Sequence, residues 1–134
     1  MIVIPKNIYN EMIDHAKTGY PNEACGILAG AEAKKTAAFF PMKNLDESSI
    51  SYFMDPKEQL RVFKEIREKN WQMLGIFHSH VASVAFPSQK DVRLAFYPEV
   101  SYLIVSLSDK KKPVLRSFVI QDEKITEEEI KLGG

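Results

Sequence analysis

Residues 71–80 read WQMLGIFHSH, and the predicted fold depends on this stretch. Its apolar residues predict a central strand, which ends in two histidines, His78 and His80. Residues two apart on a strand point to the same face of a sheet, so both imidazoles should project together while Ser79 points the other way. The stretch therefore predicts a central strand that carries two candidate metal ligands at its carboxyl end.

Strand and helix patterns lie on both sides of this stretch. We expect further strands at residues 2–4 (an edge strand), 24–30, 35–42, 50–54, 100–108, 114–120 and 123–130. We expect one helix from Pro5 to near Gly19, where Ile8, Met12 and Ala16 recur every four residues. We expect a second helix at residues 55–70 and a third from Ser88 that stops before Pro98.

Asp55 gives the second helix a side-chain cap, and Pro56 suits its first position. Residues 35–42 should pair with 24–30 as a hairpin, and 114–120 should pair with 100–108. Sheet segments interrupted by helices indicate an α/β fold, a three-layer α/β/α sandwich with a mixed sheet. A length of 134 residues predicts one domain that spans the whole chain.

Composition excludes several classes of protein. The chain has 18 Lys and Arg against 18 Asp and Glu, so its charge gives no reason to expect nucleic acid or a membrane surface as partner. No apolar run approaches the roughly 20 residues of a membrane span, and the first residues lack the features of a signal peptide. A single cysteine, Cys25, excludes an internal disulfide and favours a reducing, cytoplasmic location. We expect Cys25 to be a buried, small apolar residue.

Residues 78–91 read HSHVASVAFPSQKD and contain a metal-ligand pattern. Asp91 and the two histidines supply three of the four ligands that a tetrahedral zinc ion needs. The fourth position is then free for water, and this feature distinguishes a catalytic zinc site from a structural one. The pattern therefore predicts a metal-dependent hydrolase.

Each half of this pattern also has a purely structural interpretation. Two histidines on a strand can be half-buried residues that bond to the backbone, and Ser88-x-x-Asp91 is a helix-capping pattern. We expect Ser88 to cap its helix in either case. The two halves together, within fourteen residues, favour the metal site. His15 lies outside the pattern, and we expect it to be an ordinary, partly exposed residue.

A zinc hydrolase also needs a general base near the metal-bound water. Glu23 lies just before the apolar strand at 24–30, where its carboxylate could reach over the end of a sheet. The alternative is a solvated loop glutamate. By charge alone Asp46, Glu47 and Asp55 are equally eligible, so the residues themselves leave this choice open.

Together, Glu23, the run His78-Ser79-His80, Ser88 and Asp91 resemble the JAMM motif of the JAB/MPN metalloproteases. That motif is a distant glutamate, then His-(Ser/Thr)-His, seven residues, Ser, two residues and Asp. The flanking sequences PNEACGILAG and GIFHSH are similar to the short prokaryotic branch of the family. The resemblance covers essentially the whole chain and implies a fold similar to the cytidine-deaminase sandwich.

The resemblance also implies a role for each residue of the motif. His78, His80 and Asp91 would hold zinc. Glu23 would take a proton from the zinc-bound water and pass it to the leaving amine, and Ser88 would stabilise the oxyanion. The family cleaves peptide or isopeptide bonds after the Gly-Gly tail of ubiquitin-like proteins. This short chain looks more like the bacterial forms that process sulfur-carrier proteins.

Several alternatives stay open. A non-catalytic scaffold module of the same fold is one, and a structural zinc site closed by His15 or Cys25 is another. Val81 stands where members of the family usually have proline. Val84 and Phe86 in the apolar loop that follows could cover the site, pack on a substrate or complete the core.

Two features bear on self-association. Exposed strand edges could pair two copies of the chain as a homodimer. We expect residues 132–134, Leu-Gly-Gly, to be a frayed tail. The alternative is that this tail docks in the site of a neighbouring molecule.

Overall fold

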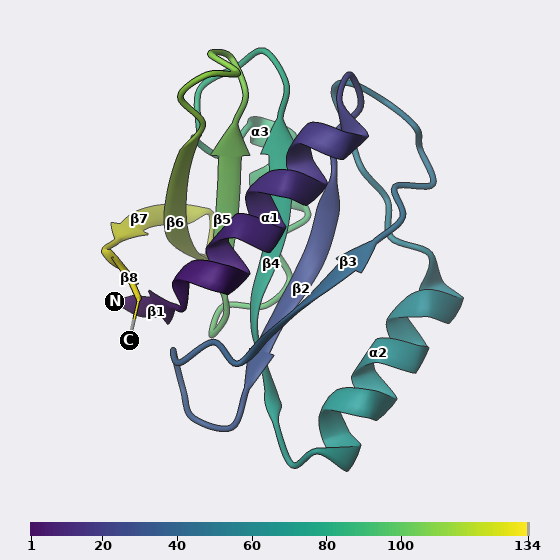
Figure 1. Cartoon of the computed structure of the whole chain (residues 1–134), viewed down its shortest axis with the longest axis vertical. Helices are drawn as coiled ribbons and strands as arrows, with labels where there is room; N and C mark the ends of the chain where they lie inside the picture. The colour runs from purple at the N-terminus through teal and green to yellow at the C-terminus, as the bar shows by residue number, and fades with distance from the viewer. Residues whose placement is uncertain (134) are drawn as a thin grey trace.

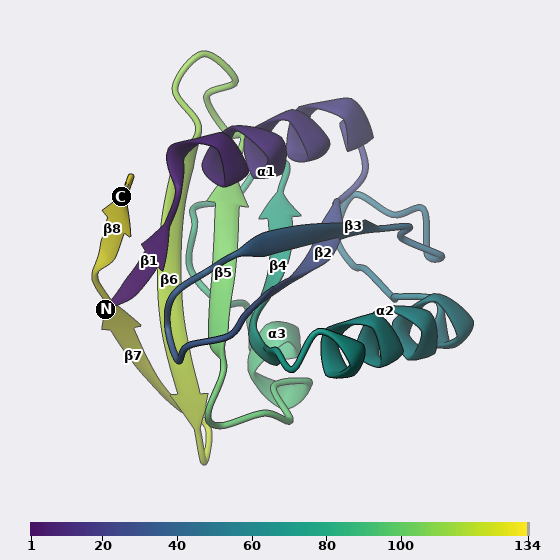
Figure 2. The same cartoon turned by 60° about the horizontal axis from the view of Figure 1, so that its bottom comes forward.

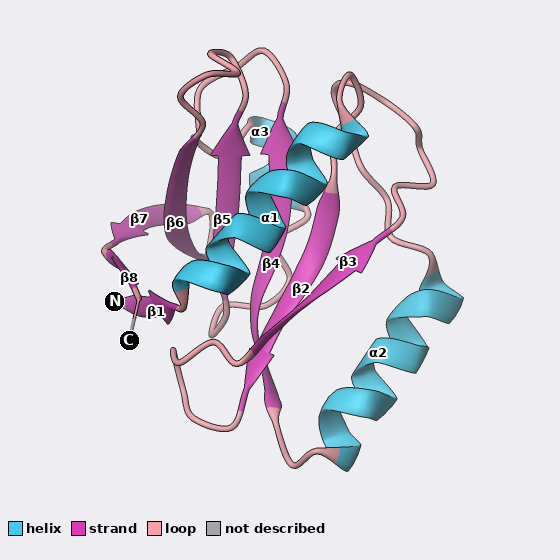
Figure 3. Cartoon of the chain, viewed as in Figure 1, coloured by secondary structure: helices cyan, strands magenta, loops and turns pink. Residues whose placement is uncertain are grey.

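A six-stranded mixed sheet forms the middle of the protein, in a computed structural model that describes residues 1–133 (Figures 1 and 3). Its strand order is β3-β2-β4-β5-β6-β7. Only the pairing of β4 with β5 is parallel, and the other neighbours are antiparallel. The strands are β2 Cys25–Gly30, β3 Ala38–Met42, β4 Gln72–His80, β5 Ser101–Ser106, β6 Val114–Gln121 and β7 Lys124–Glu128.

Helices cover both faces of this sheet (Figure 2). Helix α1 (Lys6–Gly19) lies on one face, and α2 (Pro56–Glu68) and α3 (Gln89–Arg93) lie on the other. The predicted three-layer α/β/α sandwich with a mixed sheet is therefore confirmed. Within residues 1–133, none of the helices combines the length and apolar character needed to cross a membrane.

The core has a part on each face of the sheet, because successive side chains of a strand point to opposite faces. Phe77 of β4 packs with the buried face of α1, whereas Ile76 packs with the cluster formed by α2. Because side chains alternate along a strand, His78 and His80 follow Ile76 onto the face of α2 and α3. The position of the two histidines at the end of a buried central strand is thus set by the same pattern that builds the core.

Local sequence explains the start of α2 and the buried face of α1. The Asp55 side chain accepts a hydrogen bond from Lys57 N at 3.0 Å, with Pro56 in the first turn, so the predicted cap is confirmed. Three residues of the predicted apolar stripe in α1, Ile8, Met12 and Ala16, are buried. Both helices therefore form where the sequence predicts them.

The edge strand predicted at residues 2–4 forms: β1 (Ile2–Ile4) pairs in parallel with β8 (Ile130–Leu132) in a separate two-stranded sheet. Three other predicted elements differ in extent. The strand expected at 123–130 is two strands, β7 and β8. The strand expected at 35–42 begins only at Ala38, and the third helix ends after five residues.

The strand expected at 50–54 is wrong. These residues belong to a loop in which only Met54 forms a β-bridge, with Asn44. The apolar side chains there do not alternate between two faces: Ile50 and Phe53 are exposed, and Met54 is buried. A strand would have no single apolar face to bury, so the segment is held by side-chain hydrogen bonds instead.

Residues 132 and 133, the last described residues of the chain, form backbone hydrogen bonds with β1 or pair with it. Leu132 lies in β8, and Gly133 N donates a hydrogen bond to Ile4 O at 3.0 Å. The expectation of a frayed tail is therefore wrong for these two residues, because β1 offers them backbone partners. Gly134 lies outside the described residues.

A largely covered carboxylate on β7, that of Glu128, allows a test of the fold. Glu128 accepts hydrogen bonds from Ser101 Oγ and Ser117 Oγ and lies 3.2 Å from Lys34 Nζ. Burial alone would raise the pKa of Glu128, but these hydrogen bonds and the Lys34 charge lower it below its ordinary value. We expect Glu128→Gln to lower the free energy of unfolding by about 2 kcal/mol at pH 7, because a neutral amide loses charge-assisted hydrogen bonds.

This stabilisation depends on pH in a defined direction. Since the pKa of Glu128 is lowered in the folded state, the stabilisation is complete above the ordinary pKa and is lost as pH falls through the folded value. Urea unfolding should show a difference between wild type and Glu128→Gln that narrows below about pH 4. The exposed Glu129→Gln is the matched control. A difference that stays constant down to pH 2 would contradict the assignment.

Candidate metal centre

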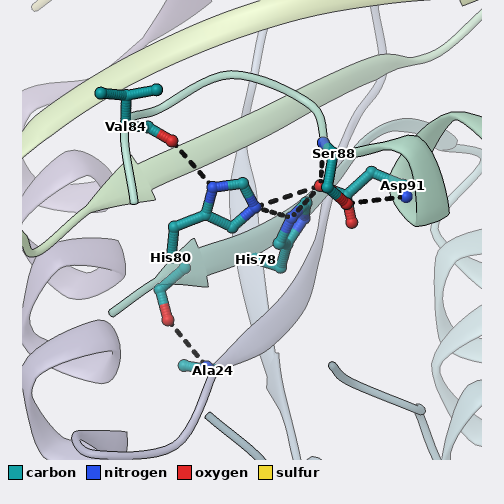
Figure 4. Close-up of polar contacts among 7 residues, drawn as sticks. Ala24, His78, His80, Val84, Ser88 and Asp91 are labelled. Atoms are coloured by element: carbon teal, nitrogen blue, oxygen red, sulfur yellow. Dashed lines mark hydrogen bonds and ion pairs between the residues drawn. The ribbon is translucent and has the colours of Figure 1, made fainter. Parts of the chain in front are cut away.

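Three candidate ligands meet between the end of β4 and the start of α3 (Figure 4). His78 Nε2 lies 3.1 Å from His80 Nε2 and 3.2 Å from Asp91 Oδ2. His80 Nε2 lies 3.1 Å from the same carboxylate oxygen. Both imidazoles are buried, and the carboxylate is largely covered. The structure thus brings these three predicted residues into one group, which we call the ligand triangle.

The ligand triangle fits zinc. A tetrahedral ion with bonds of about 2.0–2.1 Å to nitrogen and oxygen places its donor atoms roughly 3.3 Å apart. The observed separations of 3.1–3.2 Å are close to that value. Among residues 1–133, no fourth His, Cys, Asp or Glu joins the group, and His15 Nε2 instead donates to the carbonyl of Cys25 at 3.0 Å. A site closed by His15 or Cys25 is therefore not what the structure shows.

The ring of His80 is fixed by a backbone hydrogen bond. Its Nδ1 lies 2.8 Å from Val84 O. Because a carbonyl only accepts, Nδ1 donates its hydrogen to Val84 O, which leaves Nε2 as the ring nitrogen that faces the ligand triangle. The Val84 and Phe86 side chains are both exposed, and Phe86 packs edge-on against Phe118. The functional contact of Val84 is thus its carbonyl, which its apolar side chain gave no reason to expect.

The ring of His78 is held differently. Its Nδ1 is buried and has no hydrogen-bond partner among the described residues. The ring of Tyr52 stacks on it, with centroids 4.7 Å apart and an interplanar angle of 23°. Burial lowers the pKa of His78, so the neutral, metal-binding form is favoured. Stacking therefore takes the place of the hydrogen bond that usually orients a ligand imidazole.

Ser88 and Asp91 form a reciprocal capping box at the start of α3. Asp91 N donates to Ser88 Oγ at 3.0 Å, and Ser88 N donates to Asp91 Oδ2 at 2.9 Å. The predicted cap is confirmed. Although burial alone would raise it, hydrogen bonds from His78, His80 and Ser88 N hold the pKa of Asp91 well below its usual range. The carboxylate stays ionised, as a metal ligand must.

Glu23 lies two residues before the start of β2 and is not a solvated loop residue. Only 6% of it is exposed, and burial raises the pKa of Glu23 to about 7, with the charge of His80 opposing that rise and the charge of Asp91 adding to it. The three other carboxylates that were candidates for the general base have different surroundings. Asp55 caps α2, Asp46 bonds to Ser51, and Glu47 is exposed.

Ser79 connects the ligand strand to the segment that carries Glu23. Its Oγ accepts a hydrogen bond from Ala24 N at 2.8 Å, and its own N–H donates to Ala24 O at 3.0 Å. The sequence predicted only that Ser79 points away from the histidines. The contact links residues 55 positions apart, so no local pattern could have revealed it.

Comparisons with known proteins identify the family to which this chain belongs. A family model described as prokaryotic homologues of the JAB domain matches residues 5–121. A CysO-cysteine peptidase of Mycobacterium tuberculosis is 38% identical over 131 residues, which cover 97% of this chain and 90% of the relative. A desampylase of Pyrococcus furiosus is 32% identical over 129 residues, with 96% and 89% coverage. The solution structure of a protein from Desulfitobacterium hafniense is 47% identical, with a TM-score of 0.90 and coverage of 98% and 92%.

Proposed function

The chain belongs to the prokaryotic homologues of the JAB domain and is a JAMM-type protease, and on that premise we propose that it is a zinc enzyme that hydrolyses the bond after a Gly-Gly tail. The protein that carries the tail would be a small ubiquitin-like or sulfur-carrier protein. The observation that carries the proposal is the ligand triangle of His78, His80 and Asp91 with the buried carboxylate of Glu23 nearby.

His78, His80 and Asp91 would hold the metal, since two neutral imidazoles and one ionised carboxylate are a zinc donor set. When bound, zinc supplies a Lewis acid and lowers the pKa of a coordinated water to about 7. The protein keeps these ligands ready through the Val84 carbonyl on His80, the Tyr52 ring on His78 and the capping box around Asp91.

Glu23 would accept the proton of the attacking water and then pass it to the leaving amine. A general base works best when its pKa lies near the working pH, and burial brings the pKa of Glu23 to about 7. Ser88 would donate to the oxyanion, because its Oγ accepts from Asp91 N and keeps its hydroxyl hydrogen available. These two roles distinguish the proposed enzyme from a non-catalytic module.

The substrate proposal follows from the relatives and from the chemistry of glycine. The mycobacterial relative is named a CysO-cysteine peptidase, so a cysteine leaving group is the first to test. Two glycines carry no side chains, and an extended Gly-Gly tail can therefore approach a buried metal centre closely. The proposed homodimer and cytoplasmic location stay predictions.

The proposal is tested with a ubiquitin-like domain whose Gly-Gly end is followed by one cysteine. We expect the zinc-loaded protein to release cysteine and leave the Gly-Gly end intact, as measured by mass spectrometry. Removal of the metal with a chelator should stop the release, and added zinc should restore it. A second substrate, with Gly-Gly joined to a lysine side chain, tests the isopeptide reaction. If the zinc-loaded protein cleaves neither substrate, the proposed function is wrong.

A further inference from the structure

The loop between β3 and α2 is closed around one side chain, that of Asn44. Its Nδ2 donates to Glu23 O and to Ser51 O, each at 3.0 Å. Its Oδ1 accepts from Asp46 N and Phe53 N, each also at 3.0 Å. A carboxamide has two N–H donors and one oxygen with two lone pairs, so these four bonds use its full capacity.

Two of these bonds flank Tyr52. Asn44 contacts the carbonyl of the residue before Tyr52 and the N–H of the residue after it. Tyr52 is the residue whose ring stacks on His78, and His78 Nδ1 has no hydrogen-bond partner among the described residues. The orientation of a candidate metal ligand therefore depends on a ring whose backbone Asn44 fixes on both sides.

A third bond reaches the segment that carries the proposed base. Asn44 Nδ2 holds the carbonyl of Glu23, and Glu23 N donates to Ser48 O of the same loop at 2.8 Å. The loop thus holds Glu23 by hydrogen bonds to both its backbone N–H and its backbone carbonyl. On the far side, Ala24 is held by Ser79. A change in the loop would therefore move Glu23 as well as Tyr52.

We propose that Asn44 is a positioning residue for the hydrolytic site, because one carboxamide places Tyr52 against His78 and Glu23 near the ligand triangle. Asn44 acts only through these two residues and is not itself a member of the ligand triangle. The inference rests on the proposed function for the role of Glu23, but its consequence for the metal does not require a substrate. Zinc affinity and activity therefore test it separately.

Two substitutions separate the bonds of Asn44. Asn44→Asp has the same shape and keeps the acceptor for Asp46 N and Phe53 N, but it lacks the N–H groups that hold Glu23 O and Ser51 O. Asn44→Ala removes all four bonds. Asn10→Ala makes the same chemical change at an exposed position of α1 and is the control. Tyr52→Ala and Tyr52→Phe form a second pair, in which only the phenylalanine keeps a stacking ring.

Three measurements follow: zinc affinity by competition with a chelator, kcat and KM on the Gly-Gly substrate, and amide hydrogen exchange of the metal-free protein. We expect the zinc affinity and the kcat of both Asn44 variants to be about 10- to 100-fold lower than those of the wild type. Losses of this size are usual when the support of a metal ligand is removed. The loss should fall on kcat more than on KM. Exchange should be faster at residues 44–54 and unchanged in β6.

Tyr52→Ala should show the same loss of zinc affinity, whereas Tyr52→Phe and Asn10→Ala should bind zinc as the wild type does. If Asn44→Ala speeds loop exchange but keeps wild-type zinc affinity and kcat, Asn44 is only structural and the inference is wrong. Wild-type zinc affinity in Tyr52→Ala would also overturn it. If the wild type cleaves neither substrate while Asn44→Ala still weakens zinc binding, the proposed function fails and the positioning of His78 stands.

Discussion

Purified Asp91→Ala should contain almost no zinc, whereas the wild type should contain about one ion per chain. Asp91 supplies the only carboxylate of the ligand triangle, and without it two imidazoles on one strand remain. Two neutral nitrogen donors bind zinc far more weakly than a set of three that includes a negative charge. Peptidase activity should be lost together with the metal.

The fold should survive this substitution. Asp91 closes the capping box with Ser88, and the loss of half a cap costs about 1 kcal/mol. Helix α3 has five residues, none of them fully buried, and the apolar contact of its Val92 with the core is not altered by a change at position 91. The decisive measurement compares thermal unfolding with and without zinc. Added zinc should stabilise the wild type by mass action and leave Asp91→Ala unchanged.

Asp109→Ala is a matched control for Asp91→Ala. Asp109 also accepts a backbone hydrogen bond, from Lys111 N at 3.0 Å, but it lies outside the ligand triangle. It should retain zinc and the stabilisation that zinc brings. A full equivalent of zinc in purified Asp91→Ala would show that the metal binds elsewhere, and the assignment of the centre would be wrong.

The sequence predicted most of the fold because its main signals are local. The stripe of α1, the cap of α2 and the apolar run of β4 each lie within one element, so periodicity and capping residues are sufficient. Residues 50–54 have the composition of a strand, yet they form a loop in which Asn44 binds the backbone of Ser51 and Phe53. The periodicity of apolar residues cannot predict a hydrogen bond between a side chain and the backbone of another segment.

In the site, too, the residues that are close in sequence were predictable and the contacts between distant segments were not. His78, His80 and Asp91 lie within fourteen residues on a strand and the next helix, so their spacing was enough to suggest a shared ion. The supporting contacts of Asn44 and Tyr52 join segments far apart in the chain and became visible only in the fold. The burial of Glu23 is likewise tertiary, because it follows from the packing of distant segments around it.

The structure also bears on Val81, where the resemblance to the JAMM motif led us to expect proline. Two hydrogen bonds hold the loop that follows: His80 Nδ1 donates to Val84 O at 2.8 Å, and Ser106 Oγ donates to Ser83 O at 2.6 Å. A proline would order the chain by restricting φ. Here the loop is held by His80, a candidate ligand, and by Ser106 of β5, so the loop and the ligand triangle share one hydrogen bond.

Glu23→Gln should keep zinc and lose hydrolysis, which separates it from Asp91→Ala. Glutamine has the shape of glutamate but cannot accept the proton of the attacking water. The loss of a general base typically lowers the rate by about 10²- to 10⁴-fold, so kcat on the Gly-Gly-cysteine substrate should fall within that range. Zinc content should stay at the wild-type value, because Glu23 is not in the ligand triangle.

Stability measurements give an independent check on the burial of Glu23. Since burial raises its pKa to about 7, the metal-free wild type should lose stability as pH rises from the ordinary glutamate pKa of about 4.3 to about 7. Glu23→Gln lacks this ionisation and should be at least as stable as the wild type at pH 8. The exposed Glu47→Gln should match the wild type in kcat, zinc content and pH dependence. A zinc-loaded Glu23→Gln that hydrolyses substrate at the wild-type rate would remove Glu23 as the base while leaving the metal centre intact.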